Sequence, residues 1–350
     1  MEHVNRFDAL RLIAAWLVLL DHSYPLSGSA DVNLVTRWLR LDTGGGLGVA
    51  IFFAVSGYLV TISYENCNSV AVFIKRRMLR IYPALVVLSL LSVLVLGPML
   101  TNLSLADYLH HPLTLKFLST ARGFDMFITL PGVFDGNPIS AVNGSLWSLP
   151  YELGCYLSLV AIALIPMTLR IKAGLSVGVL LVLLMTRPLV PPTSPYETYF
   201  GLDHYATQLG LIFAVGALLA TFRKLLSRRL WNSIGLFSGI GLCVAWNLPF
   251  GKGPIVLYSL CIAGAVLWLA LFGRWLPIIP EKIGDLSYGT YLYGFPVQQC
   301  LTHAHIAAYG IEAFIIASTA CTLVVAALSW HLIEKPFMRL KRSAWATATC

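Results

Sequence analysis

Hydrophobic and polar positions alternate along the chain in long blocks. Apolar runs close to the 20 or so residues that cross a bilayer recur from one end to the other, separated by short polar or Pro/Gly-containing breaks. The pattern predicts ten spanning helices, at residues 9–26, 44–64, 81–97, 146–166, 173–190, 204–222, 231–248, 254–272, 284–302 and 310–332. The expected fold class is therefore all-α, a polytopic membrane helix bundle.

Composition agrees with this pattern. Hydrophobic residues make up 57% of the 350, charged residues only 11%, and the mean hydropathy is +0.76, which leaves too little polar surface for a soluble globule. No stretch between the apolar runs is long enough for a separate soluble domain. We expect one transmembrane domain over residues 1–342 and a short tail at 343–350.

A cleaved signal peptide is the alternative for the first apolar run, which follows basic residues and precedes small ones. Cleavage would discard Arg11, Asp21 and His22, and many later segments also insert. We therefore expect the first segment to be retained.

The distribution of lysine and arginine predicts the orientation. If the N-terminus is cytoplasmic, 18 of the 24 basic residues face the cytoplasm. The remaining six are Arg37, Arg40, Lys116, Arg122, Arg187 and Lys252. Both termini are thus expected on the cytoplasmic side of the membrane. The net charge of +8 then faces anionic lipid, so no nucleic-acid partner is needed.

The longest non-spanning segment, at residues 98–145, is placed outside by this orientation. A connection of that length is uncommon in a compact protein and is often functional. We expect it to serve as a lid or as a platform for an acceptor.

Two ionisable residues close the first apolar run, in the stretch LVLLDHSYPLSG at residues 17–28. Arg11 and His22 are eleven positions apart, which returns to within about 20° of the same helix face and climbs about 16 Å. They form a polar stripe from the inner surface, with Asp21 beside it. Intramembrane ionisable residues usually face a cavity or a partner. The alternative is a solvated helix end at the outer interface.

Four cations stand in FIKRRMLRIYP, residues 73–83, just before a predicted span. One interpretation is a positive-inside anchor. The other is that Arg77 and Arg80, one helical turn apart, hold an anionic ligand, because planar guanidinium groups suit phosphate. A nucleotide-like donor entering from the cytoplasm would meet this cluster first.

Glu152 lies in a span that otherwise carries no charge, within NGSLWSLPYELGCY at residues 143–156. A carboxylate there needs a partner or water. Near an imidazole it would orient the ring and stabilise the imidazolium that forms on proton transfer. Alternatively, aromatic hydroxyls such as that of Tyr151, or an arginine, hold it.

No metal site is expected. The seven cysteines include no CxxC pair and most lie in apolar runs, as buried small hydrophobic residues do. His303 and His305 have a metal-like spacing but no carboxylate or cysteine cluster beside them. Two further polar pairs, Asp203 with His204 and Asp285 with Tyr288, open the sixth and ninth spans and are candidates for lining the same cavity.

Small residues mark the second span, where Gly44 and Gly48 have the small-xxx-small spacing that lets helices approach closely. No Gly-Lys-Ser/Thr follows the glycines, so a phosphate-binding loop is excluded. Ser56 lacks the context of a nucleophile and is expected to form a hydrogen bond within the bundle.

Taken together, six segments resemble the acyltransferase family 3 membrane proteins of bacteria, which O-acylate sugars and related surface molecules. The segments are NRFDALRLIAAWLVLLDH, GGLGVAIFFAVSGYLV, FIKRRMLRIYP, GSLWSLPYELGCY, LSYGTYLYGFPV and WHLIEKP. Each is weak alone, but the ordered set is specific and covers nearly the whole chain.

The resemblance implies roles for particular residues. Arg11 and His22 match the family's Arg-x10-His signature, whose histidine is regarded as catalytic. Arg77 and Arg80 match its Arg-x-x-Arg signature, associated with the acyl-CoA donor. Glu152 matches the acidic residue of a Ser-x-x-x-Glu signature that begins here at Ser148.

Two features depart from other family members. Gly294 occupies a position where the family often has histidine, which puts a second catalytic histidine in doubt. No hydrolase-like domain of the kind some members carry is appended, so we expect transfer to be completed within the membrane domain.

The resulting hypothesis is an acyltransferase that takes acyl-CoA, acetyl-CoA by default in the family, from the cytoplasm. It would acylate a hydroxyl of an extracytoplasmic glycan or lipid-linked sugar. His22, oriented by Glu152 or Asp21, acts as general base or carries the acyl group itself. The rival is a transporter or flippase that uses the polar stripe as a substrate or proton path.

Overall fold

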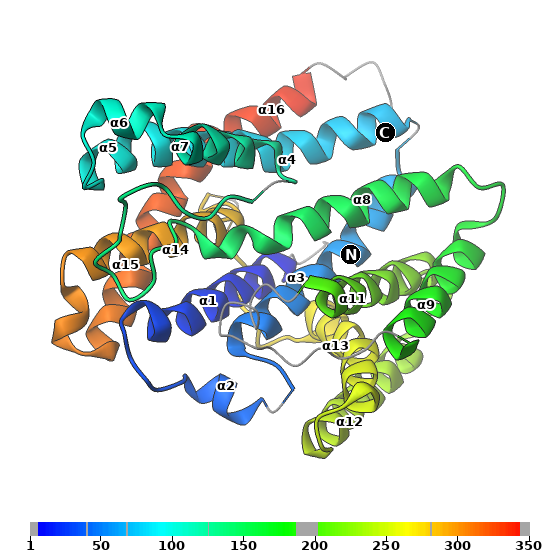
Figure 1. Ribbon diagram of the computed structural model, residues 1–350. Helices are drawn as coiled ribbons and strands as arrows, with labels where there is room; N and C mark the ends of the chain where they lie inside the picture. The colour runs from blue at the N-terminus through cyan, green and yellow to red at the C-terminus, as the bar shows by residue number, and fades with distance from the viewer. Residues whose placement is uncertain are drawn as a thin grey trace. The chain divides into compact units, whose positions relative to one another are not determined.

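The computed structural model describes residues 6–39, 41–67, 69–124, 126–186, 202–280 and 282–343. Arg40, Arg187 and the tail from residue 344 lie outside these ranges, as do the side chains of Asp203 and His204. All regular secondary structure in the described part is helical (Figure 1). The all-α prediction is therefore confirmed.

Each predicted span falls on a helix. These are α1 (Phe7–Leu26), α3 (Gly44–Glu65), α4 (Val70–Leu91), α8 (Leu149–Ala163), α9 (Leu169–Thr186), α11 (Leu202–Phe222), α12 (Arg228–Asn247), α13 (Lys252–Phe272), α14 (Ser287–His303) and α15 (Ile311–Ser329). In the described part, six helices are long and apolar enough to cross a membrane: α3, α4, α9, α11, α13 and α15. The count of ten spans and the cytoplasmic placement of both termini stay predictions.

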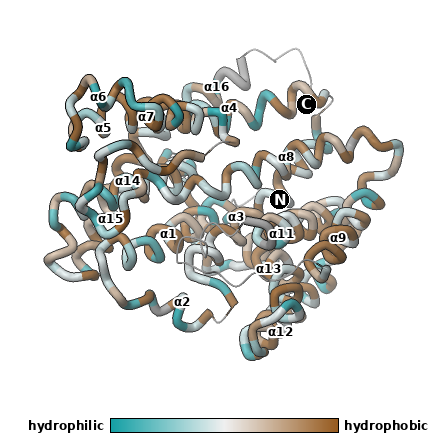
Figure 2. Tube along the Cα trace, viewed as in Figure 1, coloured by the Kyte–Doolittle hydropathy of each residue, from teal (hydrophilic) through white to brown (hydrophobic). Residues whose placement is uncertain are grey.

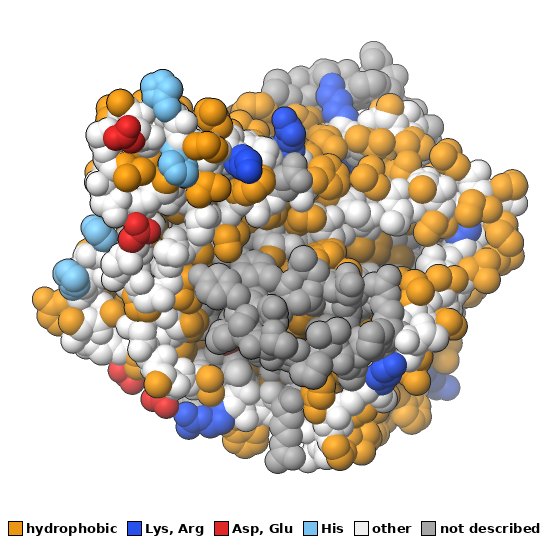
Figure 3. All heavy atoms as spheres, in the orientation of Figure 1, with side chains coloured by type: hydrophobic (Ala, Val, Ile, Leu, Met, Phe, Trp, Pro, Cys, Tyr) orange, Lys and Arg blue, Asp and Glu red, His pale blue; other side chains and the backbone are white. Residues whose placement is uncertain are grey.

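Large apolar side chains are exposed along these helices, as expected of a surface that faces lipid. Examples are Val179 and Val182 of α9 and Ile316 and Val324 of α15. The hydropathy of α9 is evident along its trace in Figure 2. In Figure 3, apolar side chains cover much of the visible face and charged ones are few.

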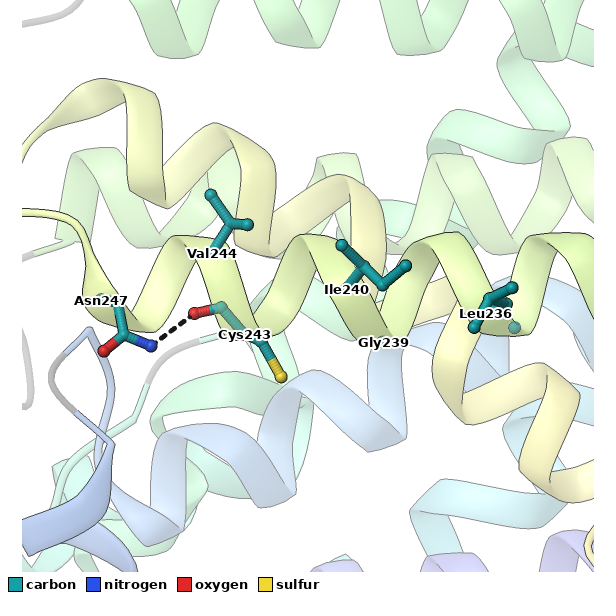
Figure 4. A pocket seen from close by; sticks show the side chains of 7 residues that line it. Leu236, Gly239, Ile240, Cys243, Val244 and Asn247 are labelled. Carbon is teal, nitrogen blue, oxygen red and sulfur yellow. Dashed lines mark hydrogen bonds between the residues drawn. The ribbon is translucent and has the colours of Figure 1, made fainter.

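A groove along the exposed face of α12 has the same apolar character (Figure 4). Leu236, Ile240 and Val244 line it together with small residues. Its polar side chain, Asn247, donates to the carbonyl oxygen of Cys243 at 2.8 Å. Apart from Asn247 and the Cys243 thiol, the groove is lined by apolar side chains and glycines and offers surface for lipid.

The packing of helices divides the chain into two compact units. Unit 1 comprises residues 1–11, 35–70 and 151–278, and unit 2 comprises residues 12–34, 71–150 and 279–350. That the two units act as one transmembrane domain stays a prediction.

Helix α11 is the centre of unit 1, where it packs against α3, α9 and α13. The approach to α3 is close because glycines face backbone. A Cβ on Gly57 would lie 2.1 Å from the carbonyl oxygen of Phe213, and one on Gly216 would lie 2.6 Å from that of Ala54. No side chain can be added at either position without moving a helix.

In unit 2, α14 packs against α15 and the 3₁₀ turn η3 (Gly144–Ser148). Two long helices here contain π-helical turns, η1 (Ser92–Leu96) after α4 and η5 (Trp330–Glu334) after α15. Each turn ends two residues before a proline, Pro98 or Pro336. Proline lacks an N–H and its ring clashes with the carbonyl four residues back, which accounts for the widened turns.

Helix α4 begins at Val70, eleven residues before the span predicted from residue 81. The basic segment is thus part of the helix and not a flank before it. Hydropathy alone placed the boundary too late because consecutive cations interrupt the apolar run, although Lys and Arg are good helix formers.

The segment at 98–145 is folded. It contains α5 (Gly97–Leu100), α6 (Leu105–His110), α7 (Pro112–Phe117), η2 (Leu118–Arg122) and η3. Tyr108 and Phe134 are buried in its core, and the Tyr108 hydroxyl donates to the Val93 carbonyl oxygen at 3.0 Å. Burial raises the pKa of Tyr108 to about 12. This ordered packing suits a rigid platform better than a floppy connection.

Candidate active site

His22 and Asp21 lie near the C-terminal end of α1, which runs unbroken from Arg11 to both. The side chains are 8% and 5% exposed. Such burial excludes the alternative of a solvated helix end, since charged and polar groups at that degree of burial need partners.

Ser145 and Phe295 are neighbours of the His22 imidazole in unit 2. The Ser145 hydroxyl lies 3.4 Å from Nδ1. The Phe295 ring packs edge-on, with 5.2 Å between ring centroids and 75° between planes. When Nδ1 carries the proton it donates to Ser145, and Nε2 becomes the basic nitrogen. The Ser145 hydroxyl can equally donate to an unprotonated Nδ1, so the contact positions the ring in either tautomer.

Ser145 is fixed by its own surroundings. Its backbone N–H donates to Asn143 Oδ1 at 3.1 Å, the cap of the η3 turn. Its carbonyl oxygen accepts from the Tyr291 hydroxyl at 2.5 Å, and that hydroxyl is 2.6 Å from Ser148 Oγ. Asn143 Nδ2 donates to the Leu292 carbonyl oxygen at 2.9 Å, which ties the turn to α14. The hydroxyl that meets His22 is therefore held in place by α14.

A second set of contacts joins α14 directly to α1. Gln298 Nε2 donates to the Leu19 carbonyl oxygen at 2.9 Å and to Ser23 Oγ at 2.7 Å. Gln298 is fully buried, so these bonds are shielded from water. These bonds hold α1 on both sides of His22, at Leu19 and at Ser23.

Gly294 lies one turn of α14 before Gln298. A Cβ added there would meet Leu19 at 3.5 Å and Thr322 at 3.8 Å, which is ordinary contact. Glycine is therefore not forced at this position by a backbone clash. The structure gives no steric reason for the departure from histidine.

Asp21 points to another partner. Its Oδ1 accepts a hydrogen bond from the side-chain amide of Asn33, which is itself buried. The segment after α1 thus folds back to satisfy the carboxylate. Asp21 is in the same unit as His22, and its catalytic role stays a prediction.

Arg80 occupies a cage of unit 2. Its Nη2 lies 2.5 Å from Asp285 Oδ2, and its Nη1 lies 3.3 Å from Glu334 Oε2. The guanidinium also lies over the rings of Tyr288 and Trp330, at 5.6 and 5.8 Å from their centroids. Asp285 and Tyr288, predicted as cavity-lining residues, are thus neighbours of this arginine.

Arg77 has different surroundings, although it precedes Arg80 by one turn. Its Nε is buried, and the residue makes no hydrogen bond or ion pair with the described part of the chain. The two members of the predicted phosphate-binding pair are therefore not equivalent.

Glu152 and Arg11 belong to unit 1. Glu152 accepts hydrogen bonds from the Tyr156 hydroxyl and, at 3.4 Å, from the Ser56 hydroxyl. An aromatic hydroxyl does hold the carboxylate, from Tyr156 one turn along α8, and the intrabundle bond expected of Ser56 is present. The proposed relation of Glu152 to His22 stays a prediction.

Within the described ranges no three His, Cys, Asp or Glu side chains come together as a metal site would require. The described cysteines form no disulfide.

Comparison with known proteins gives the family. The model described as an acyltransferase domain matches residues 4–333. The chain belongs to acyltransferase family 3. It is 31% identical over 350 residues to an O-acetyl transferase of Shigella phage Sf6, with 97% of each chain covered.

Two further family relatives extend the comparison. Nodulation protein 10 of Rhizobium leguminosarum bv. viciae is 31% identical, covering 97% of this chain and 95% of its own. A peptidoglycan O-acetyltransferase of Listeria monocytogenes is 26% identical over 97% of this chain but only 56% of its own length. No solved structure was found to match. The protein is thus a membrane acyltransferase, and the family match argues against the transporter alternative.

Several neighbours of the acyltransferase site were missed by sequence reasoning. Asn143 and Ser145 stand in the NGSLWSLPYELGCY stretch, in which the sequence indicates Glu152 as the candidate. Tyr291 and Gln298 belong to α14, which lies in a predicted span but carries several polar side chains. That number of polar residues in a span is the signal in the sequence that could have identified them. Asn33, in a connecting segment, carried no signal.

Proposed function

We propose that the protein transfers an acyl group, acetyl in the first instance, from cytoplasmic acyl-CoA to a hydroxyl of an extracytoplasmic glycan or lipid-linked sugar. His22 is the catalytic residue, and the bacterial inner membrane is the location. The family relatives include two O-acetyltransferases, one of them acting on peptidoglycan. That supports both the group transferred and the class of acceptor.

The observation that carries the proposal is the buried imidazole of His22 with Nδ1 facing the Ser145 hydroxyl. In the tautomer whose Nδ1–H donates to Ser145, Nε2 is unprotonated and can take the proton of a substrate hydroxyl, as general bases in acyl transfer do.

Two chemical routes are consistent with this geometry. In the first, Nε2 takes the proton of the acceptor hydroxyl while the acceptor oxygen attacks the thioester carbonyl. The C–S bond breaks, and the leaving CoA thiolate recovers the proton. In the second, Nε2 attacks the thioester carbonyl, the C–S bond breaks and CoA leaves as a thiolate. The acceptor oxygen then attacks the acyl carbon, the bond to Nε2 breaks, and the acceptor proton passes to the thiolate. In both, acyl-CoA and an alcohol become an ester and free CoA.

The other residues have supporting roles in this proposal. Asp21 or Glu152 compensates the positive charge that His22 gains, because a carboxylate near an imidazolium stabilises it. Arg11 and the segment with Arg77 and Arg80 form the cytoplasmic approach for the anionic donor. Neither route requires a metal.

Acetyl-CoA binding to the purified protein in nanodiscs, measured by calorimetry, tests the donor. We expect saturable binding and, with membranes that contain an acceptor, release of free CoA thiol. A folded protein that binds neither acetyl-, succinyl- nor longer acyl-CoA would contradict the proposal. Asp21→Asn and Glu152→Gln, compared in the release assay, identify which carboxylate assists His22, by a loss of at least about 10-fold.

A further inference from the structure

The two arginines of the Arg-x-x-Arg segment differ in the carboxylates that contact them, and this difference indicates different roles. Arg80 contributes one positive charge to a cage with two carboxylates, Asp285 and Glu334. These three side chains together contribute two negative charges and one positive charge. A phosphate that approached Arg80 would meet two carboxylates already in contact with it, and its entry would be opposed by their repulsion.

The donors of the Arg80 guanidinium are also committed. Nη1 and Nη2 each serve a different carboxylate. The remaining carboxylate oxygens are satisfied by neighbours: Asp285 Oδ1 accepts from the Ser287 hydroxyl and backbone N–H, and Glu334 Oε1 accepts from the Ser329 hydroxyl at 3.1 Å. All four carboxylate oxygens of Asp285 and Glu334 are thus bonded, and such a network is costly to open.

The surrounding backbone is shaped to form this cage. The π-helical turn η5 directs both Trp330 and Glu334 inward, where both are buried. Trp330 covers one approach to the guanidinium and Tyr288 another. The wide turn is set by Pro336, so the proline of the WHLIEKP segment also serves the cage.

Arg77, by contrast, has no carboxylate against it in the described part of the chain, and its side chain is partly exposed. A guanidinium with uncommitted donors can make the paired, charge-assisted hydrogen bonds that phosphate accepts. We propose that Arg77 is the member of the pair that binds a donor phosphate. Arg80 is a positioning residue that fastens α4 to the start of α14 and to η5. The part concerning the donor rests on the proposed function.

Four variants separate these roles, with acetyl-CoA as the probe. We expect Arg77→Ala to weaken acetyl-CoA binding at least about 10-fold without lowering the unfolding temperature. Arg80→Ala should lower that temperature by about 5 °C or more, because it leaves the buried carboxylate of Glu334 and the partly buried one of Asp285 without their cation. Arg80→Ala/Asp285→Asn/Glu334→Gln should recover both stability and binding. Arg274→Ala, which removes an exposed cation elsewhere, is the control for lost charge.

The outcomes are distinct. A folded triple variant that still fails to bind acetyl-CoA, or Arg77→Ala with unchanged affinity, would overturn the assignment while leaving the proposed function in place. If the wild-type protein binds no acyl-CoA, the proposed function fails, and the unfolding temperatures of Arg80→Ala and the triple variant still test the cage. Equal stability of those two variants would refute it.

Discussion

The two units hold their helices together by different means. In unit 1, α3 and α11 approach until the glycines of one face the backbone of the other, as at Gly57 and Gly216. In unit 2, α14 is joined to its neighbours by buried polar side chains, among them Gln298 and Tyr291. One unit relies on shape and the other on hydrogen bonds.

The difference has a physical reason. In an apolar environment the hydrophobic effect does not drive helices together, so they associate by close packing or by polar contacts. Polar contacts carry the greater risk, because a lost partner leaves a buried group unsatisfied. Around His22, unit 2 nevertheless relies on polar contacts, because they fix the orientation of the imidazole ring.

The largest loss of stability in unit 1 is expected from Gly57→Ala, which tests the close packing of α3 on α11. The new methyl group would lie 2.1 Å from a backbone carbonyl oxygen of α11, so the two helices must separate. We expect the free energy of unfolding to fall by about 1–3 kcal/mol, measured as a lower unfolding temperature in detergent.

Gly239→Ala provides the matched control. This glycine of α12 has nothing within 4 Å of an added Cβ, so the substitution should leave stability unchanged or raise it slightly through helix propensity. If the two variants unfold at the same temperature, close packing of α3 on α11 is not what stabilises unit 1.

A smaller and different effect is expected in unit 2 from Ser145→Ala. The change removes the hydroxyl 3.4 Å from His22 Nδ1 but little packing. We expect the transfer rate to fall roughly 10-fold, with the KM for acetyl-CoA and the unfolding temperature nearly unchanged.

Ser27→Ala is the corresponding control, because Ser27 directly follows α1 and its hydroxyl donates to the Tyr24 carbonyl oxygen in the last turn of that helix. Ser145→Thr, which keeps the hydroxyl, should restore much of the rate. Full transfer activity in Ser145→Ala would show that the orientation of His22 does not depend on this contact.

Much of the helical fold could be predicted from hydropathy. Each predicted span lies on a helix because about 20 apolar residues in succession leave the backbone no other way to satisfy its polar groups. The start of α4 could not be placed, since its cations interrupt the apolar run. The π-helical turns follow from Pro98 and Pro336, yet a proline alone does not indicate how a helix adapts.

The candidate site, too, could be predicted from the sequence only in part. Spacing along one helix identified Arg11 and His22 as a stripe, because helix geometry is local. The partners of His22 and Arg80 come from distant segments, as Ser145 and Glu334 do. A sequence gives the type of such residues but not which of many polar side chains will meet, and so Arg80 was grouped with Arg77.

The most direct test of the account is transfer of labelled acetyl from acetyl-CoA to glycan in membranes that contain the wild-type protein or His22→Ala at equal, folded levels. We expect His22→Ala to lose at least about 100-fold of the alkali-labile label in the glycan fraction. It should retain acetyl-CoA binding and the wild-type unfolding temperature. Labelling by His22→Ala at the wild-type rate would contradict the catalytic role of His22 and the mechanism built on it.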